Sequence, residues 1–354
     1  MNSQADSNVL KSRGTGAVVL SFICLVFLYA SAALAADNDR PSASPVEEYN
    51  LPTPLSFPID LAIDDSGHVW YTAQKADKIG VFDPKDKKFR EFDLPKGSSP
   101  SDMAIDAGGV VWFTMPTSSA IGSLTPKTGK IDIRKVPSNN AEPYMLAISK
   151  DGGVWFTERN ANKIAVFNGK TFKEYSVLTP NSQPTGIALD SKGVIWFTEA
   201  VGNNIGAIDQ AQKTIREYKI PTVYANPSDI TVDAGDKVWF VEMNGNRVCM
   251  LDPVTRVFNE AIIPTPSSVP VRLAISAEGI VWFTENRGNR VGRFDPVTAA
   301  FTEYPIPTAT SLPVGIAAGP SGKVWFTESA RDANKLSSVS DAGNGASARG
   351  GVQR

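Results

Sequence analysis

The sequence predicts an all-β fold, a seven-bladed β-propeller that forms a single domain. A short apolar phrase centred on tryptophan, such as Val-Trp-Phe-Thr-Glu, recurs seven times and uses every tryptophan of the chain. The steps between successive tryptophans are 42, 43, 41, 43, 43 and 43 residues, a period that matches one propeller blade of four strands. No part of the repeats has the apolar spacing that a helix requires. The tryptophans are Trp70, Trp112, Trp155, Trp196, Trp239, Trp282 and Trp325.

Each repeat has the same order of predicted strands. A proline opens a short apolar strand, an Asp/Ser/Gly turn follows, and the tryptophan strand comes next, as in residues 184–199. A loop ending in Asn leads to a third strand, and a fourth strand carries an aromatic residue and ends in proline. Short strands separated by Gly, Asp, Asn and Pro turns are typical of antiparallel β proteins. We expect the tryptophans to fill the space between neighbouring blades.

The two ends of the repeat array predict how the ring closes. Residues 47–53 match the end of later repeats but precede the first tryptophan strand, and the last repeat has no aromatic fourth strand. Pairing the N-terminal strand with the last blade completes the ring and covers two sheet edges that would otherwise promote aggregation. The propeller is therefore expected over residues 46–340, with a linker at 36–45 and a disordered tail at 341–354.

Residues 1–35 have the pattern of a signal peptide. Lys11 and Arg13 precede an uncharged apolar run, and an Ala-Leu-Ala sequence ending at Ala35 suits a signal peptidase. We therefore expect an exported protein, periplasmic or secreted, that is cleaved near Ala35. A membrane anchor is the alternative, because the uncharged span of residues 14–36 is long enough to cross a bilayer.

The charge of the chain does not indicate nucleic acid or an anionic membrane as a partner. The formal net charge is -2, and the sequence has no run of basic residues. We expect a monomer with no nucleic-acid partner and no membrane association after signal cleavage. A small molecule or a protein is expected to bind at a propeller face.

The repeats share one consensus over about residues 46–340. It reads P-x-x-[IL]-A-x-D-x-x-G-x-[VI]-W-F-T-E, then N-[KR]-[IV]-G-x-[FIL]-D-P, then F-x-E-Y-x-I-P-T. In this consensus the chain resembles the virginiamycin B lyase (streptogramin lyase) family of seven-bladed propellers. For members that degrade streptogramin B antibiotics, the resemblance implies an Mg²⁺-dependent elimination that opens the ester of a cyclic depsipeptide.

The catalytic residues that the resemblance implies are replaced in this chain. In the resembled family, a His follows the proline that opens the innermost strand of blades six and seven, and a Glu precedes that proline in blade seven. One imidazole would remove the proton next to a carbonyl, and the other groups would hold the metal and protonate the leaving oxygen. The matching positions hold Val271, Val314 and Leu312, which cannot transfer a proton. The single His of the chain, His68, lies in the turn before Trp70, and we interpret it as a surface turn residue.

Any site in a repeat protein requires a departure from the repeat. Two residues after the strand-opening proline, this chain holds Asp60, Asp102, Asp229 and Arg272, where the resembled family mostly has small residues. If these side chains share the mouth of the central channel, they could bind a polar ligand, and the three aspartates could bind a divalent cation, Mg²⁺ or Ca²⁺. The alternative is that they only cap strand starts. Tyr144 copies a His position in an E-P-H motif and is a further candidate at the channel mouth, although its phenol is a poor base.

A Glu ends the tryptophan strand in five of the repeats. We expect its carboxylate to bond to the backbone or to a nearby Lys or Arg, and a metal or substrate role is the alternative. The residues are Glu158, Glu199, Glu242, Glu285 and Glu328.

Two functions remain open from the sequence. The first is an exported streptogramin lyase-like propeller that acts as a binding or scaffold module without lyase activity. The second is a metal-dependent lyase or hydrolase of an ester or lactone, with Asp60, Asp102, Asp229 and Arg272 as its site, by analogy with propeller lactonases. The sequence has no His cluster, no Ser/His/Asp set and no phosphate-binding loop. Cys249 is the only cysteine expected in the mature chain, so no intramolecular disulfide is expected.

Overall fold

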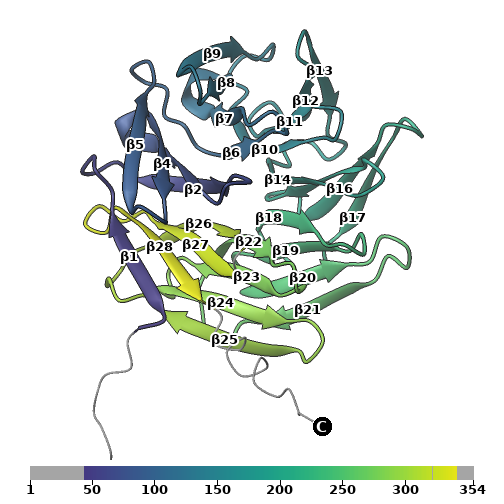
Figure 1. The fold of residues 1–354 in the computed structure, drawn as a ribbon. Helices are drawn as coiled ribbons and strands as arrows, with labels where there is room; N and C mark the ends of the chain where they lie inside the picture. The colour runs from purple at the N-terminus through teal and green to yellow at the C-terminus, as the bar shows by residue number, and fades with distance from the viewer. Residues whose placement is uncertain (1–43, 321, 341–354) are drawn as a thin grey trace, which may run out of the picture. The chain divides into compact units, whose positions relative to one another are not determined.

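A computed structural model describes residues 44–320 and 322–340, which belong to one compact unit. Their strands form seven antiparallel sheets of four strands each, arranged as the blades of a ring (Figure 1). The predicted all-β, seven-bladed propeller is therefore confirmed. The predicted signal peptide, most of the linker and the predicted tail lie outside the described residues. Within the described part of the chain, no helix is long and apolar enough to cross a membrane.

The strands follow the predicted repeat. Blade 1 has β2 Pro58–Ile63, β3 Val69–Ala73, β4 Lys78–Asp83 and β5 Lys88–Asp93. Blade 2 has β6 Met103–Ile105, β7 Val111–Met115, β8 Ala120–Thr125 and β9 Lys130–Lys135. Blade 3 has β10 Pro143–Ile148, β11 Val154–Glu158, β12 Lys163–Phe167 and β13 Phe172–Ser176. Blade 4 has β14 Pro184–Leu189, β15 Ile195–Glu199, β16 Asn204–Asp209 and β17 Thr214–Lys219.

The remaining blades have the same order. Blade 5 has β18 Pro227–Val232, β19 Val238–Glu242, β20 Arg247–Leu251 and β21 Phe258–Ile262. Blade 6 has β22 Pro270–Ile275, β23 Val281–Glu285, β24 Arg290–Asp295 and β25 Ala300–Pro305. Blade 7 has β26 Pro313–Ala318, β27 Lys323–Glu328, β28 Lys335–Ser340 and β1 Val46–Asn50. Two single-turn 3-10 helices follow tryptophan strands, η1 Gln74–Ala76 and η2 Pro116–Ser118.

The ring closes through the N-terminal strand, as predicted. β1 pairs with β28 in an antiparallel register that places Val46 opposite Val339 (Figure 1). The side chain of Asn334 adds a second link, because its oxygen accepts the backbone N–H of Ser56 at 2.8 Å and its amide donates to the carbonyl of Thr53 at 3.0 Å. β1 therefore completes the four-stranded sheet of blade 7 and covers the edge of β28.

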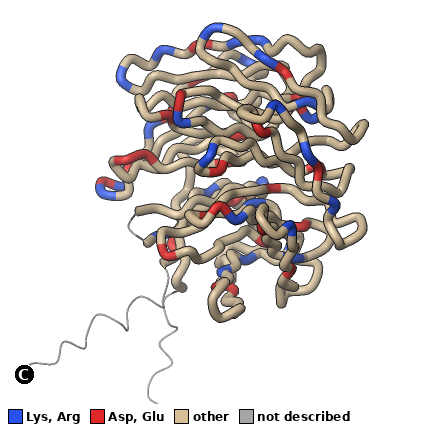
Figure 2. The backbone as a smooth tube through the Cα atoms, turned by 90° about the vertical axis from the view of Figure 1, so that its right-hand side faces the viewer, with Lys and Arg blue, Asp and Glu red and all other residues tan. Residues whose placement is uncertain are grey.

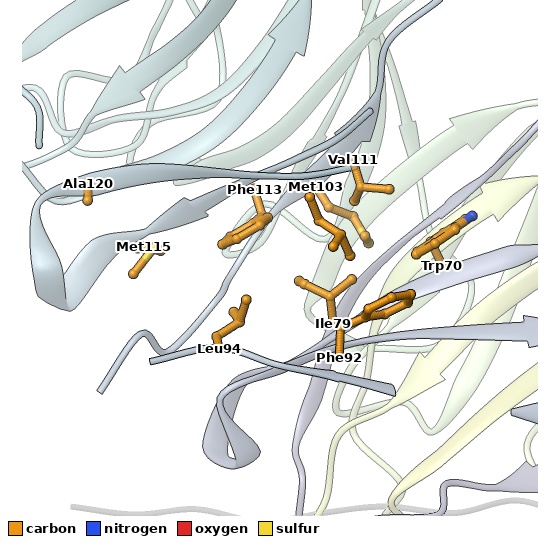
Figure 3. Close-up of a cluster of buried hydrophobic side chains, with 10 residues drawn as sticks. Trp70, Ile79, Phe92, Leu94, Met103, Val111, Phe113, Met115 and Ala120 are labelled. Atoms are coloured by element: carbon orange, nitrogen blue, oxygen red, sulfur yellow. The ribbon is translucent and has the colours of Figure 1, made fainter. Parts of the chain in front are cut away.

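The tryptophans pack between neighbouring blades, which confirms their predicted role. Trp70 of blade 1, for example, belongs to the same core cluster as Met103, Val111 and Phe113 of blade 2 (Figure 3). Its indole N–H also donates to the Asp64 carboxylate in the preceding turn at 3.0 Å. The same Asp-to-Trp bond occurs in blades 2, 4 and 5. This bond was not predicted from the sequence, although the fixed spacing of six residues between Asp and Trp in these blades is its signal.

Candidate functional site

The innermost strands of the blades are neighbours around the ring and place one variable residue of each blade in a shared position. In the blade 1 sheet the pairing of β2 with β3 slips between Pro58 and Leu61, which marks a bulge at Asp60. The backbone N–H of Asp60 donates to the Thr72 hydroxyl at 3.0 Å, and Asp102 makes the matching bond in blade 2. The residues at this position are Asp60, Asp102, Met145, Gly186, Asp229, Arg272 and Gly315.

Four of these residues, from four different blades, converge on one another. Nη2 of Arg272 lies 2.6 Å from Oδ1 of Asp102 and 4.0 Å from Oδ1 of Asp60. Nη1 of Arg272 lies 3.8 Å from Oδ1 of Asp229. The four residues are buried, with 3 to 8% of their surface exposed. The predicted convergence is therefore present, and it takes the form of a buried ion cluster with Arg272 in contact with every aspartate.

Each aspartate of this cluster also ties its blade to the next one. Oδ2 of Asp60 accepts the backbone N–H of Met103 at 3.0 Å, and Oδ2 of Asp102 accepts that of Leu146 at 2.7 Å. Asp229 makes the equivalent bond with the N–H of Leu273 at 3.0 Å. The aspartates therefore accept strand N–H groups with one oxygen and face the Arg272 guanidinium with the other.

The electrostatics of the cluster follow from its burial. Burial, followed by the negative charge of Asp102, raises the pKa of Asp60 well above its ordinary value. Burial also raises the pKa of Asp229 to about 6, against the lowering effect of Arg272. Burial lowers the pKa of Arg272, but the charges of Asp102, Asp60 and Asp229 outweigh this and raise it. The guanidinium therefore stays charged, and burial favours the protonated form of Asp60.

This arrangement does not favour a divalent cation between the three aspartates. Their oxygens already accept backbone N–H groups or face the Arg272 guanidinium, and a positive charge already occupies the place between them. Over residues 44–320 and 322–340, one group of three metal-ligating side chains has ligand atoms within 4.8 Å of one another, and it is Glu242, Cys249 and Glu260. Metal binding by the aspartates stays a prediction that the geometry does not support.

The positions implied for an Mg²⁺-dependent lyase do not fit that ion either. Val271 and Val314 are half-buried, and their backbone carbonyls accept the hydroxyls of Ser228 and Thr284, both at 2.8 Å. Leu312 is 36% exposed and, like the two valines, has no ligand atom in its side chain. No step of a metal-dependent reaction can therefore be assigned to these residues.

Tyr144 and His68 lie outside the ion cluster. The Arg159 guanidinium lies over the Tyr144 ring, 4.4 Å from its centroid, and Nε of Arg159 donates to Glu142 at 3.0 Å. The Tyr144 side chain is therefore half-buried, and Arg159 covers one face of its ring. His68 lies in the turn after β2, with 38% of its side chain exposed and Nδ1 3.0 Å from the Asp64 carboxylate. It is thus a partly exposed turn residue, as interpreted from the sequence.

The Glu residues that end the tryptophan strands differ from one another: Glu242 lies 3.7 Å from Nη1 of Arg247, its expected partner, whereas Glu158 does not reach Lys163. Glu158 is fully buried, and neither of its oxygens has a hydrogen-bond partner. Nζ of Lys163, the expected partner, donates instead to Glu174 in the fourth strand at 2.6 Å. The expected bond between Glu158 and the backbone or Lys163 is therefore wrong. The fourth-strand Glu competes for the lysine because it is less buried and keeps its charge at a lower cost.

Burial raises the pKa of all five of these Glu residues. The pKa rises to about 7 for Glu158, Glu199, Glu242 and Glu328, and to about 8 for Glu285. Burial is the first cause in each case, and the neighbouring fourth-strand Glu adds to it. The blades therefore contain a set of carboxyl groups that titrate near neutral pH.

Replacing Glu285 with Gln should stabilise the protein at alkaline pH. The pKa of Glu285 in the folded protein, about 8, lies above the ordinary value of a Glu carboxyl. The stability that its protonated form contributes is therefore present at low pH and is lost as the pH rises through about 8. Gln cannot ionise, so Glu285→Gln should raise the free energy of unfolding by about 1 kcal/mol or more near pH 8.5 and change it little near pH 5. Urea denaturation at both pH values measures this. An equal change in the free energy of unfolding at both pH values would contradict this prediction. Asp86→Asn, a substitution at an exposed position, is the control.

Comparisons with known proteins identify the family. The family model described as the Virginiamycin B lyase family matches residues 41–238 and 135–346. Selenomethionine-substituted virginiamycin B lyase from Staphylococcus aureus is 32% identical, with a TM-score of 0.78, over 83% of this chain and 98% of that one. A streptogramin B lyase structure is also 32% identical, with a TM-score of 0.78, over 83% of this chain and 96% of that one.

A third structure contains a ligand. It is a catalytically inactive histidine-to-alanine variant of virginiamycin B lyase from Staphylococcus aureus with quinupristin. It is 33% identical, with a TM-score of 0.78, over 83% of this chain and 98% of that one. A comparison with curated proteins found no match. The matches of the family model and of these structures show that the chain belongs to the virginiamycin B lyase family.

Proposed function

We propose that this protein is an exported, streptogramin lyase-like propeller that acts as a binding module and does not cleave streptogramin B antibiotics. The observation that carries the proposal is the presence of Val271, Val314 and Leu312 where the resemblance implies two His and one Glu. Elimination next to a carbonyl requires a group that accepts a proton near neutral pH, and aliphatic side chains cannot do so. The only His, His68, lies at the other end of β2 from the strand-opening proline.

The ion cluster supports binding rather than metal-dependent catalysis. Arg272 is held by Asp102 and faces Asp60 and Asp229, so its guanidinium is fixed in position. Fixed polar groups beside the half-buried Val271 and Val314 suit the recognition of a ligand. A metal-dependent lyase or hydrolase would need free carboxylate oxygens, and these are already bonded.

The expected partner is a small molecule or a protein at a propeller face, bound by a monomer. Figure 2 shows Lys and Arg interspersed with Asp and Glu along the described chain in that view. This mixture of charges supports a partner that is recognised by its shape and by individual polar contacts, rather than by the electrostatic field of a surface with one sign of charge.

Quinupristin tests the absence of lyase activity. We expect no ring-opened product when the protein is incubated with quinupristin and Mg²⁺, because no side chain at positions 271, 312 and 314 can move a proton. Elimination gives a ring-opened isomer of unchanged mass, whereas hydrolysis would add the mass of one water. Liquid chromatography with tandem mass spectrometry distinguishes these products from intact quinupristin. The Staphylococcus aureus lyase is the positive control. Ring-opened quinupristin from this protein, at a rate that depends on enzyme concentration, would refute the proposal.

Export is part of the same proposal. The basic residues, the apolar run and the Ala-Leu-Ala sequence before Ala36 support removal of residues 1–35. We expect the intact mass of the protein recovered from the periplasm or medium to begin at Ala36. Recovery in the membrane fraction with residues 1–35 retained would favour the membrane anchor instead.

A further inference from the structure

Blade 5 carries three metal-ligating side chains on adjacent strands. Cys249 of β20 lies opposite Glu260 of β21 in the sheet, and Glu242 ends the neighbouring strand β19. One carboxylate oxygen of each Glu and the cysteine Sγ lie within 4.8 Å of one another. We propose that these three residues bind one thiophilic divalent cation, with Zn²⁺ as the expected ion. The site is separate from the ion cluster, whose blade 5 member, Asp229, lies on the innermost strand β18.

The register of the sheet places the three side chains on one face of blade 5. Cys249 pairs with Phe240 on one side and with Glu260 on the other, and Glu242 follows Phe240 by two residues. Residues that pair across strands, and residues two apart within a strand, share a face of the sheet. The set is therefore built on three neighbouring strands, which hold its ligands in fixed positions.

The Glu242 carboxylate is fully buried, and neither of its oxygens accepts a hydrogen bond from an N–H or O–H group of the described residues. Burial of a carboxylate without such a partner costs free energy, which a bound cation would recover. Glu260 is the accessible member of the set, with 22% of its side chain exposed, and it gives an ion a route from solvent. Its Oε1 accepts the Thr222 hydroxyl at 3.1 Å, which leaves Oε2 for the ion.

The charge of the site leaves room for a divalent cation beside Arg247. Nη1 of Arg247 lies 3.7 Å from Glu242 and Nε lies 3.9 Å from Glu260, so the guanidinium is beyond hydrogen-bond distance of both carboxylates. In the ion cluster, by contrast, Nη2 of Arg272 lies 2.6 Å from Asp102. Once the cysteine is a thiolate, three negative charges face a single guanidinium, and a divalent ion balances the charge that remains.

The sulfur ligand decides which ion fits. Burial, followed by the charge of Glu242, raises the pKa of the Cys249 thiol well above its ordinary value, so the thiol keeps its proton until a metal ion displaces it. Zn²⁺ accepts both thiolate and carboxylate ligands in a tetrahedral site, whereas Mg²⁺ and Ca²⁺ prefer oxygen alone. Three protein ligands leave the fourth position of the zinc ion for a water molecule.

Blade 3 has the two carboxyl groups without the thiol. Ala165 stands where blade 5 has its cysteine, opposite Glu174 of the next strand, and Glu158 ends the tryptophan strand. Nζ of Lys163 donates to Glu174 at 2.6 Å, so this carboxylate is already paired with a cation. Zinc is therefore expected in blade 5 and not in blade 3, and Glu158→Gln is the matched control.

Metal titration of the full chain, after treatment with a chelator, tests the proposal. We expect calorimetry to show one Zn²⁺ bound through this site, and Co²⁺ in its place to give a thiolate-to-cobalt absorption band in the near ultraviolet. Cys249→Ala should abolish the band and weaken zinc binding by about tenfold or more, and Glu260→Gln should weaken zinc binding about tenfold while the band remains. Zinc should also raise the thermal midpoint of the wild type but not that of Cys249→Ala.

The control Glu158→Gln should leave both the zinc affinity and the cobalt band unchanged. The proposal fails if the wild type binds no zinc, if its cobalt form lacks the thiolate band, or if Cys249→Ala binds zinc as tightly as the wild type. Glu260 is partly exposed, so Glu260→Gln tests the site without disturbing the core around the cysteine. Wild-type affinity in Glu260→Gln, or an equal loss in Glu158→Gln, would also overturn the proposal.

Discussion

Arg272→Met is expected to lower the free energy of unfolding by about 3 to 5 kcal/mol at neutral pH. The variant keeps the apolar stem of the side chain but removes the guanidinium from Asp102, Asp60 and Asp229. Three buried carboxyl groups are then left without a cation, and a buried charge without a partner is strongly destabilising. Urea or guanidinium denaturation, followed by tryptophan fluorescence, measures the loss.

The pH dependence of this loss identifies its cause. Burial holds the pKa of Asp229 at about 6, above its unfolded value, so the stability from its protonated form is lost as the pH rises through about 6. Without Arg272 this pKa moves higher still, so the loss should be largest above about pH 6 and smaller near pH 4.5. Adding Asp102→Asn should restore part of the stability. A loss that is independent of pH and is not relieved by Asp102→Asn would show that Arg272 acts through packing alone.

Trp282→Ala is expected to cost about 3 to 5 kcal/mol of unfolding free energy. Trp282 is 1% exposed and packs against Ile316, Val324 and Phe326 of blade 7. Its ring also stacks on Tyr304, with centroids 5.6 Å apart. Alanine would leave a cavity at the boundary between two blades, and the rigid strands on either side cannot close it. Equilibrium denaturation gives the difference directly.

Trp112 is the internal comparison for this prediction. It fills the same position in blade 2 but is only partly buried, and the Arg134 guanidinium lies 5.4 Å from its ring centroid. Trp112→Ala should therefore cost clearly less than Trp282→Ala. Equal losses in the two variants would contradict the view that burial between blades sets the contribution of each tryptophan.

The sequence predicted much of the fold because the signals are local and repeated. The spacing from Trp70 to Trp325 counts the blades, and the orphan strand β1 predicts the closure that its pairing with β28 confirms. The sequence also located Asp60, Asp102, Asp229 and Arg272 as departures from one repeated position, and the structure brings them together. Their role in binding stays a prediction.

The sequence predicted the pairing of Arg247 with Glu242, which lie 3.7 Å apart, but not every pairing. Lys163 was expected beside Glu158 because the two are close in the chain, yet it bonds to Glu174 across the sheet. The metal hypothesis for the aspartates had the same weakness, since it treated Arg272 as one more ligand-binding group. In the structure the guanidinium contacts the carboxylates themselves and competes with any cation for them.

The sequence by itself determined the number of blades, the closure of the ring and the absence of the implied lyase groups at Val271, Val314 and Leu312. These properties depend on residue type and on spacing along the chain, and both can be read directly from the repeats. Only the tertiary structure decided that Arg272 contacts three aspartates from three other blades. Charge pairing depends on distances and burial between blades, and residues far apart in the chain set both.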